Sequence, residues 1–273
     1  MTLLIGNNLS KKYRSKAREL DAVSAVSFHL NENEILGIVG ESGSGKSTLL
    51  RMIAGLEKPD SGTLSYRGSE YQSAKVGYAG RFLQIIFQDA YGSFDPRLRM
   101  RDSMAEVRGK RQAETKSEKA SKDKWKSPGG TGTNERPAEH LQELLDLLRE
   151  TLLEENLLDK RPGELSGGQC QRMSIVRALY SGAEILLCDE MTSALDVTAQ
   201  AQIIRIFREL REKRTFSAIV VSHDIALVCA LCDRVMVMKD GKVLEEGKTS
   251  EVVRNPKNVY TEALIQSARE QSF

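Results

Sequence analysis

Short apolar runs bounded by polar residues recur along the chain, and most are too short to form a buried helix. They lie at residues 34–39 (EILGIV), 82–87 (FLQIIF), 184–190 (EILLCDE) and 217–221 (SAIVV). A short run that does not alternate between apolar and polar residues is typical of a strand buried on both faces of a parallel sheet. The pattern therefore predicts an α/β fold with a mainly parallel central sheet.

Two further patterns predict structure beside this sheet. Residues 25–30 and 62–66 read as strands of an antiparallel sheet, and Asp240-Gly241 between two apolar runs indicates a hairpin. From about residue 94 to residue 165 the strand signal disappears and leucines recur at helical spacing. We expect a helical lobe with these leucines in its core: Leu141, Leu144, Leu145, Leu147, Leu148, Leu152 and Leu153.

These patterns divide the chain into the parts of one domain, residues 1–273. We expect a core with the antiparallel β lobe (1–93 and 166–250), a helical lobe (about 94–165) and a C-terminal tail (251–273). Residues 108–126 carry eight Lys or Arg against three acids, and glycines follow at 128–133. Low hydrophobicity with excess charge predicts a flexible surface loop over 108–136. Contact with anionic lipid or with an acidic loop of a membrane partner is the alternative.

Composition narrows the functional class. The formal net charge is +2, which indicates no general attraction to nucleic acid. No apolar stretch approaches the ~20 residues that span a bilayer, and the first residues do not resemble a signal peptide. We expect a cytosolic protein. The four cysteines agree with a reducing compartment, and the lone pair Cys229 and Cys232 is better explained by helix packing than by metal binding.

Residues 40–48 read GESGSGKST and fit the phosphate-binding pattern G-x-x-x-x-G-K-[ST]. Glycines let the backbone turn its N–H groups toward phosphate oxygens, and the following helix adds its positive end. Lys46 is expected to reach the β- and γ-phosphates of ATP, and Ser47 to ligate Mg²⁺. The predicted nucleotide-binding residues are Gly40, Glu41, Ser42, Gly43, Ser44, Gly45, Lys46, Ser47 and Thr48.

The run at 184–190 ends in two carboxylates, Asp189 and Glu190. Adjacent residues on a strand point to opposite faces, so the two acids are expected to have different roles. We predict that Asp189 holds Mg²⁺ and that Glu190 acts on the attacking water as general base or polarising group.

Residues 165–169 read LSGGQ, and with the phosphate-binding loop and the Asp-Glu pair this motif resembles the ATP-binding cassette (ABC) ATPases. The resemblance covers most of the chain and implies the roles of further residues. Gln88 resembles the Q-loop glutamine that senses the γ-phosphate and Mg²⁺, and Asp196 belongs to a D-loop (193–196). His223 resembles the switch histidine, although a lone histidine at a strand end is more often structural. Tyr13 resembles the aromatic residue that stacks on adenine, with a strand cap as the alternative.

In this family the LSGGQ of one cassette closes over the ATP held by another. The resemblance implies that Ser166, Gly167, Gly168 and Gln169 contact nucleotide in this way, with help from a helix that starts near Gln169. The chain has one copy of each motif, so it must pair with a second cassette, identical or paralogous.

Three further runs are similar to the ATPases of peptide and nickel importers: 87–97 (FQDAYGSFDPR), 193–201 (SALDVTAQA) and 255–263 (NPKNVYTEA). The resemblance implies a bacterial importer of peptides, nickel or metal–chelator complexes. Its partners would be two membrane permeases and an external substrate-binding protein, with no nucleic acid. The chain would lie on the cytoplasmic face of the inner membrane. Met191 departs from the family, which usually has Pro there.

Two alternatives stand beside this interpretation. One is a soluble ABC ATPase that acts on nucleic acid, the ribosome or cluster assembly; the long coiled coil or second cassette of such relatives is not seen. The other is a regulatory subunit that binds ATP and barely hydrolyses it, against which Glu190 and His223 argue.

The charged loop yields the first testable prediction. Deleting residues 110–133 should leave ATP hydrolysis intact, because a solvated insertion contributes no catalytic group. The measurement is phosphate release by the purified deletion variant and the full chain. An inactive but folded deletion variant would show that the segment is part of the machinery.

Overall fold

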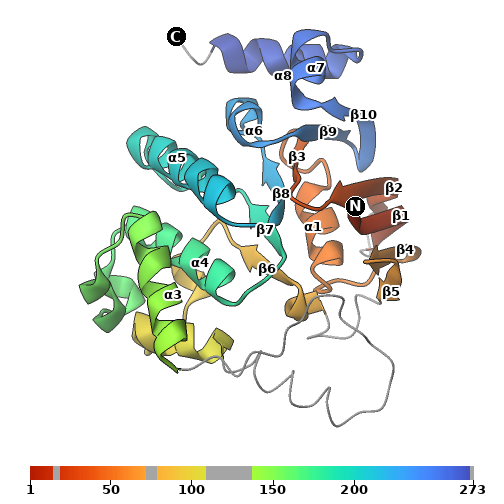
Figure 1. Ribbon diagram of the computed structural model, residues 1–273. Coiled ribbons are helices and arrows are strands. Elements are labelled where there is room, and N and C mark those ends of the chain that lie inside the picture. Colours follow the sequence, from red (N-terminus) through yellow and green to blue (C-terminus); the bar gives the residue numbers. More distant parts are fainter. Residues whose placement is uncertain (15–18, 72–78, 109–136, 271–273) are drawn as a thin grey trace, which may run out of the picture. The chain divides into compact units, whose positions relative to one another are not determined.

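The computed structural model describes residues 1–14, 19–71, 79–108 and 137–270 (Figure 1). The chain forms two compact units, one of Met1–Gln88 with Ala183–Phe273 and the other of Asp89–Gly182. Most of the predicted charged loop, residues 109–136, lies outside the described residues. Arg108, which the charge pattern places in that loop, is instead helical, as are residues 100–107 before it.

The larger unit is built on a six-stranded sheet in the order β10-β9-β3-β8-β7-β6. All neighbouring strands in it are parallel except β9 and β10. Every residue of β3 and of β8 is buried, which is why both read as continuous apolar runs. The predicted mainly parallel sheet is confirmed. Its strands are β3 (Ile35–Val39), β6 (Leu83–Ile86), β7 (Ile185–Asp189), β8 (Ser217–Ser222), β9 (Arg234–Lys239) and β10 (Lys242–Lys248).

The second sheet of this unit is antiparallel, in the order β2-β1-β4-β5. Its strands are β1 (Thr2–Arg14), β2 (Glu19–Asn31), β4 (Ser61–Tyr66) and β5 (Ser69–Tyr71). β2 is longer than the predicted 25–30 because its first residues pair through the backbone with Lys11–Arg14 of β1. Polar residues are interspersed among these pairs, as at Lys12 with Asp21 and Arg14 with Glu19, so this stretch does not read as a continuous apolar run.

Helix α1 (Lys46–Ile53) lies between the two sheets, where it contacts β1 and β2 of one and β7 and β8 of the other. Its residues Leu49, Leu50, Met52 and Ile53 are almost fully buried. Each such side chain contributes about 1.5–3 kcal/mol of burial free energy, so this layer is the main core of the unit.

The remaining helices of the larger unit lie beyond this core (Figure 1). On the other face of the six-stranded sheet, α6 (Ile225–Leu231) packs on β3 and β8, and α5 (Val197–Lys213) packs on α6. After β10 come α7 (Thr249–Arg254) and α8 (Val259–Glu270). The α5 N-terminus is capped by Asp196, whose carboxylate accepts from the Ala199 N–H at 2.9 Å.

The described residues of the smaller unit are helical or irregular, as predicted. Helix α3 (Pro137–Glu150) packs on α4 (Gly167–Tyr180). The predicted leucine core is only partly correct: Leu144, Leu147, Leu148 and Leu153 are buried, whereas Leu141 and Leu152 are exposed. The helix ends at Glu150, and Leu152 follows in a turn with φ 55°, so the helical spacing no longer applies to it.

The boundary of the smaller unit differs from the one expected from the sequence. The sequence pattern ends the helical lobe at about residue 165, but the unit continues to Gly182 and includes all of α4. Contacts within the unit explain this, because the Tyr91 hydroxyl donates to the Leu165 carbonyl at 2.6 Å. The Arg177 guanidinium donates to the Ser93 carbonyl at 2.6 Å and lies over the Phe94 ring at 4.1 Å.

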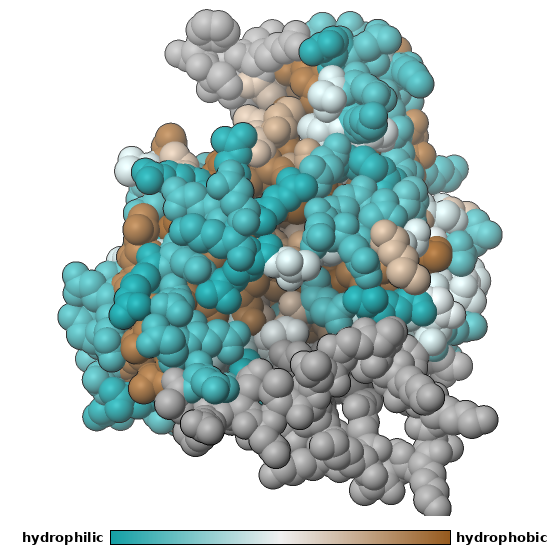
Figure 2. Space-filling view, in the orientation of Figure 1, coloured by the Kyte–Doolittle hydropathy of each residue, from teal (hydrophilic) through white to brown (hydrophobic). Residues whose placement is uncertain are grey.

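No helix in the described ranges is long and apolar enough to cross a bilayer. On the face shown in Figure 2 the described surface is mainly hydrophilic, with small separate hydrophobic patches. Isolated apolar residues of this kind are normal at the surface of a globular protein.

Arg177 provides a test of the packing within the smaller unit. Arg177→Lys should lower the free energy of unfolding by about 1.5–3 kcal/mol, because an ammonium cannot both reach the Ser93 carbonyl and stack on Phe94. Urea denaturation measures this. The matched control is Arg149→Lys, whose side chain is 68% exposed and should tolerate the change. Equal midpoints for both variants would contradict the assignment.

Candidate functional site

In the larger unit, the predicted site residues that follow strands β3, β6, β7 and β8 lie at one edge of the six-stranded sheet. Val39 pairs with Ser222, Asp189 with Val221 and Ile86 with Cys188, all in parallel register. The residues that follow these pairs therefore leave the sheet at its carboxyl edge, where ligands bind in open α/β sheets. Gly40 follows β3, Glu190 follows β7, His223 follows β8, and Gln88 comes two residues after β6.

Lys46 is the most enclosed charged group at this edge, with 4% of its surface exposed. Its Nζ donates to the carbonyls of Gly40 and Glu41 at 2.8 and 2.7 Å and to the Ser44 Oγ at 3.3 Å. Burial lowers the pKa of Lys46, while the negative charges of Glu190 and Asp189 oppose that shift. The loop thus curls around an ammonium group that faces the two carboxylates.

The loop at 40–48 ends in the N-terminus of α1, where Gly45 is the N-cap residue with φ 101° and no side-chain cap. Leu49 donates to the Gly45 carbonyl at 2.9 Å, which is the first bond of the helix. Within the described residues, the N–H groups of Lys46 and Ser47 find no acceptor, as expected for the first turn of a helix. Such N–H groups and the helix dipole favour an anion.

Neighbouring segments hold this loop from outside. The Ser44 N–H donates to the Glu41 carbonyl at 3.2 Å, and the Gly241 N–H donates to the Ser44 carbonyl at 3.1 Å. Gly241 belongs to the predicted β9–β10 hairpin turn, which is confirmed: Asp240 and Gly241 have φ of 49° and 76°. Glu41 and Ser42 are exposed, and the Glu41 N–H donates to the Tyr260 hydroxyl at 3.0 Å.

Ser47 and Asp189 come together at the start of α1 and the end of β7. The Ser47 Oγ donates to the Asp189 Oδ1 at 3.3 Å. Burial raises the pKa of Asp189, and the Ser47 hydrogen bond opposes the shift. A hydroxyl and a carboxylate oxygen beside phosphate-binding N–H groups are the hard oxygen ligands that Mg²⁺ takes, so these two residues fit that ion.

Glu190 is held in an unusual backbone conformation directly after Asp189. Its φ is 47°, a left-handed value that costs a non-glycine residue about 1–3 kcal/mol and is typical of functional sites. Ser193 closes the turn, donating to the Glu190 carbonyl from its N–H at 3.1 Å and from its Oγ at 3.0 Å. Met191, where the family usually has Pro, is buried beneath this turn.

His223 lies beside Glu190, because β7 and β8 are neighbouring parallel strands that end at the same edge of the sheet. The His223 Nδ1 is 3.6 Å from the Glu190 Oε2. The histidine side chain is 59% exposed and the glutamate side chain 23% exposed. His223 is therefore not a buried core residue, and both side chains are accessible to a ligand at the loop.

For three other predicted site residues the structure shows no hydrogen bond or ion pair with Lys46, Asp189 or Glu190 in the described ranges. They are Tyr13, Gln88 and Asp196. The Tyr13 hydroxyl donates to the Glu57 Oε2 at 2.6 Å. Burial and the Glu57 carboxylate raise the pKa of Tyr13, while a hydrogen bond with Thr48 acts to lower it. Thr48 lies in α1, so Tyr13 reaches the start of that helix. Gln88 is exposed beyond the end of β6. Asp196 caps α5, so its carboxylate already has a structural partner.

The LSGGQ motif lies in the smaller unit and forms the N-terminus of α4. Ser166 and Gln169 form a capping box: the Ser166 Oγ accepts from the Gln169 N–H at 3.3 Å, and the Gln169 Oε1 accepts from the Ser166 N–H at 2.9 Å. The helix begins at Gly167, two residues earlier than expected. The N–H groups of Gly167 and Gly168 are left in the first turn, and the Ser166 hydroxyl keeps its own proton to donate.

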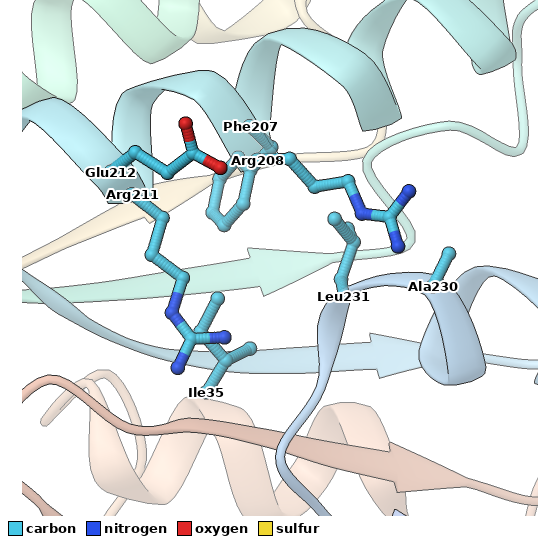
Figure 3. Close-up of a pocket in the computed structure, with 7 residues that line it drawn as sticks. All are labelled: Ile35, Phe207, Arg208, Arg211, Glu212, Ala230 and Leu231. Atoms are coloured by element: carbon cyan, nitrogen blue, oxygen red, sulfur yellow. The ribbon is translucent and has the colours of Figure 1, made fainter.

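A cavity of about 550 Å³ in the larger unit is distinct from this site (Figure 3). It is lined by Ile35 at the start of β3 and by residues of α5 and α6, including Phe207 and Arg211. Arg211 donates to both carboxylate oxygens of Asp233, at 2.8 and 2.7 Å. The phosphate-binding loop follows the other end of β3, so the cavity and the loop lie at opposite edges of the sheet.

The family of the chain is shown by comparison with known proteins. A family model described as "ABC transporter" matches residues 23–193. The chain belongs to the ABC transporter family. It is an ATPase of that family and hydrolyses ATP.

Curated ABC proteins resemble this chain over almost its whole length. The oligopeptide transport ATP-binding protein OppF of Haemophilus influenzae is 37% identical over 254 residues, which are 92% of this chain and 70% of that protein. OppD of Mycobacterium tuberculosis is 40% identical over 90% of this chain and 37% of that protein. The dipeptide transport ATP-binding protein DppF of H. influenzae is 32% identical over 92% of this chain and 71% of that protein.

Solved structures of ABC cassettes share the fold. The structure described as "Dimeric Structure of MJ0796, a Bacterial ABC Transporter Cassette" matches with a TM-score of 0.72 at 27% identity, over 90% of this chain and 99% of that chain. A second structure of MJ0796, dimeric and bound to ADP and Pi, matches with a TM-score of 0.71 at 27% identity. The expected cassette fold is confirmed.

One residue that contacts the loop at 40–48 was not predicted as a site residue. Tyr260 contacts the loop from a position 219 residues away, in a segment that the sequence patterns assign only to a tail. No local motif indicates the contact, since it depends on how α8 packs. The resemblance of residues 255–263 to importer ATPases was the one available signal.

The phosphate-binding loop yields a stability prediction. Gly45→Ala should destabilise the nucleotide-free protein by clearly more than the ~1–3 kcal/mol of backbone strain at φ 101°, because the new Cβ would also lie 2.2 Å from the Ala22 carbonyl oxygen. Gly43→Ala is the matched control, with φ 83° but nothing within 4 Å of its Cβ. It should cost only about 1–2 kcal/mol of backbone strain. Urea denaturation compares them, and equal losses would contradict the close approach of Ala22.

Proposed function

We propose that the chain is the ATP-hydrolysing subunit of an ABC importer of peptides, which uses MgATP to close a two-cassette dimer. The observation that carries the proposal is the convergence of Lys46, Ser47, Asp189, Glu190 and His223 at one sheet edge. A hydrogen bond connects Ser47 to Asp189, an ion-pair distance connects His223 to Glu190, and the charges of both carboxylates act on Lys46.

The proposed mechanism assigns one step to each group. The Lys46 side chain and the N–H groups at the start of α1, those of Lys46 and Ser47 among them, hold the β- and γ-phosphates. Ser47 and Asp189 would hold Mg²⁺, which would supply positive charge against the negative charge of the transferred phosphoryl group. Glu190 accepts a proton from the attacking water, and His223 beside it contacts the γ-phosphate.

The peripheral residues have supporting roles in the proposal. Tyr13 stacks on adenine, and Gln88 senses the γ-phosphate and Mg²⁺ from its place beyond β6. Asp196 caps α5 and so sets the turn that meets the second cassette. The helix start, with Ser166 exposed and Gly167 and Gly168 half-buried, supports phosphate contact in trans, whereas Gln169 acts chiefly by capping that helix.

A second cassette is required because the chain supplies one phosphate-binding loop and one LSGGQ. The dimeric form of MJ0796 supports this. In the proposal ATP joins the two cassettes, and hydrolysis removes the γ-phosphate contacts that hold them closed. The partner cassette is an identical chain or a paralogue.

The cargo is proposed from the relatives. OppF and OppD are named as oligopeptide transport proteins and DppF as a dipeptide transport protein, which supports peptides. These names give nickel and metal–chelator complexes no support. The other proposed subunits are two permeases and an external substrate-binding protein, which would place this chain on the cytoplasmic face of the inner membrane. The same relatives favour transport over a soluble role on nucleic acid, the ribosome or cluster assembly.

The catalytic prediction concerns Glu190. Glu190→Gln should lower kcat by about 10²–10⁴-fold, because an amide cannot accept the proton of water, while MgATP binding is retained. Phosphate release and equilibrium dialysis measure the two quantities. Glu184→Gln is the matched control, since Glu184 directly precedes β7 and pairs with Arg67 at 2.7 Å, away from the site. Undiminished hydrolysis by Glu190→Gln would remove the base assignment.

The transport role is tested by capture of partners. The bait is the tagged Glu190→Gln chain with ATP, in detergent-solubilised membranes of the native host, with mass spectrometry to identify what is retained. Two multi-span permeases would support the importer, and a second ATPase would identify a heterodimer. Recovery of soluble proteins or nucleic acid alone would contradict the importer and favour the soluble ATPase.

A further inference from the structure

The C-terminal helix α8 returns to the phosphate-binding loop. The hydroxyl of Tyr260, the second residue of that helix, accepts a hydrogen bond from the Glu41 N–H at 3.0 Å. Glu41 is the second residue of the loop, directly after the end of β3 and Gly40. The contact therefore holds the peptide group between Gly40 and Glu41, where the chain leaves β3.

The start of α8 is itself held firmly. Glu245 of β10 is 9% exposed, and its carboxylate accepts from the N–H groups of Lys257 and Asn258 at 2.9 and 3.1 Å. The Asn258 Oδ1 then accepts from the Tyr260 N–H at 2.9 Å. This chain of bonds connects the six-stranded sheet to the backbone of Tyr260, so the place of the hydroxyl is set by the sheet.

A second contact fixes the ring of Tyr260. The Lys239 Nζ lies over it at 4.5 Å from the centroid, a cation–π geometry. Lys239 ends β9 and precedes the turn whose Gly241 N–H donates to the Ser44 carbonyl. The hairpin thus holds the loop directly at Ser44 and, through Lys239 and Tyr260, at Glu41.

We propose that Tyr260 is a positioning residue of the ATP site, which keeps the phosphate-binding loop in its binding conformation by holding the Glu41 N–H. The inference rests on the proposed binding of ATP by this loop. A loop that is already ordered loses less conformational entropy when the ligand binds, so the hydroxyl contributes to ATP affinity without touching ATP. The C-terminal helix is then part of the nucleotide site rather than a tail.

This role differs from simple packing of a tyrosine on the surface. Packing needs the ring alone, and Phe would supply it. Positioning needs the hydroxyl oxygen, because only that atom accepts the Glu41 N–H. The two explanations therefore predict different behaviour for Tyr260→Phe.

The experiment measures MgATP affinity by calorimetry, together with kcat, KM and the melting temperature, for the full chain and its variants. Tyr260→Phe should raise the Kd and KM for MgATP about five-fold, the effect of one hydrogen bond, with kcat within about two-fold of the original. Tyr260→Leu should raise both at least as much. Lys239→Met, which keeps the hydroxyl but frees the ring, should raise them less.

Tyr71→Phe is the matched control. The Tyr71 hydroxyl donates to the Ile53 carbonyl at 3.0 Å at the far end of α1 from the loop. Its loss should lower the melting temperature and leave the Kd for MgATP unchanged. A Kd for Tyr260→Phe equal to that of the original chain would overturn the positioning role. If the original chain itself fails to bind MgATP, the proposed ATP site falls instead.

Discussion

The parallel alignment of β3, β8, β7 and β6 is the constraint on which the functional features of the larger unit depend. Its register brings the ends of these strands to the same edge, at pairs such as Val39 with Ser222 and Asp189 with Val221. A slip of one residue in this register would turn every side chain of the strand to the other face and would move the end of the strand away from its neighbours. Residues far apart in sequence therefore meet within hydrogen-bonding distance.

The charges at this edge are stabilised only in part by the fold itself. Burial lowers the pKa of Lys46 and raises that of Asp189, so the nucleotide-free protein bears a cost for enclosing both groups. Glu190 adds a strained backbone with φ 47°. Burial of the apolar layer around α1 offsets these free-energy costs. The enclosed groups are then already in place for an anionic ligand and its cation.

Prediction from sequence succeeded where a local pattern has a single structural meaning. The apolar runs gave β3, β7 and β8 to within a residue or two, and the Asp240-Gly241 turn gave the β9–β10 hairpin. It was less accurate where polar residues pair through the backbone, as in Lys11–Arg14 of β1, or where a helix ends before its pattern does, as at Leu152. In those places main-chain hydrogen bonds or a turn determine the structure, and neither can be predicted from the hydropathy of the side chains.

The sequence by itself determined the chemistry of this ABC ATPase, because the motifs GESGSGKST, LSGGQ and the Asp-Glu pair place each reactive group at a fixed spacing from a turn or strand end. Only the tertiary structure decided which groups meet. It put His223 beside Glu190, included α4 in the smaller unit, and brought Tyr260 to Glu41 across 219 residues. The physical reason is that spacing along a chain fixes local conformation, whereas contacts between distant segments depend on how whole elements pack.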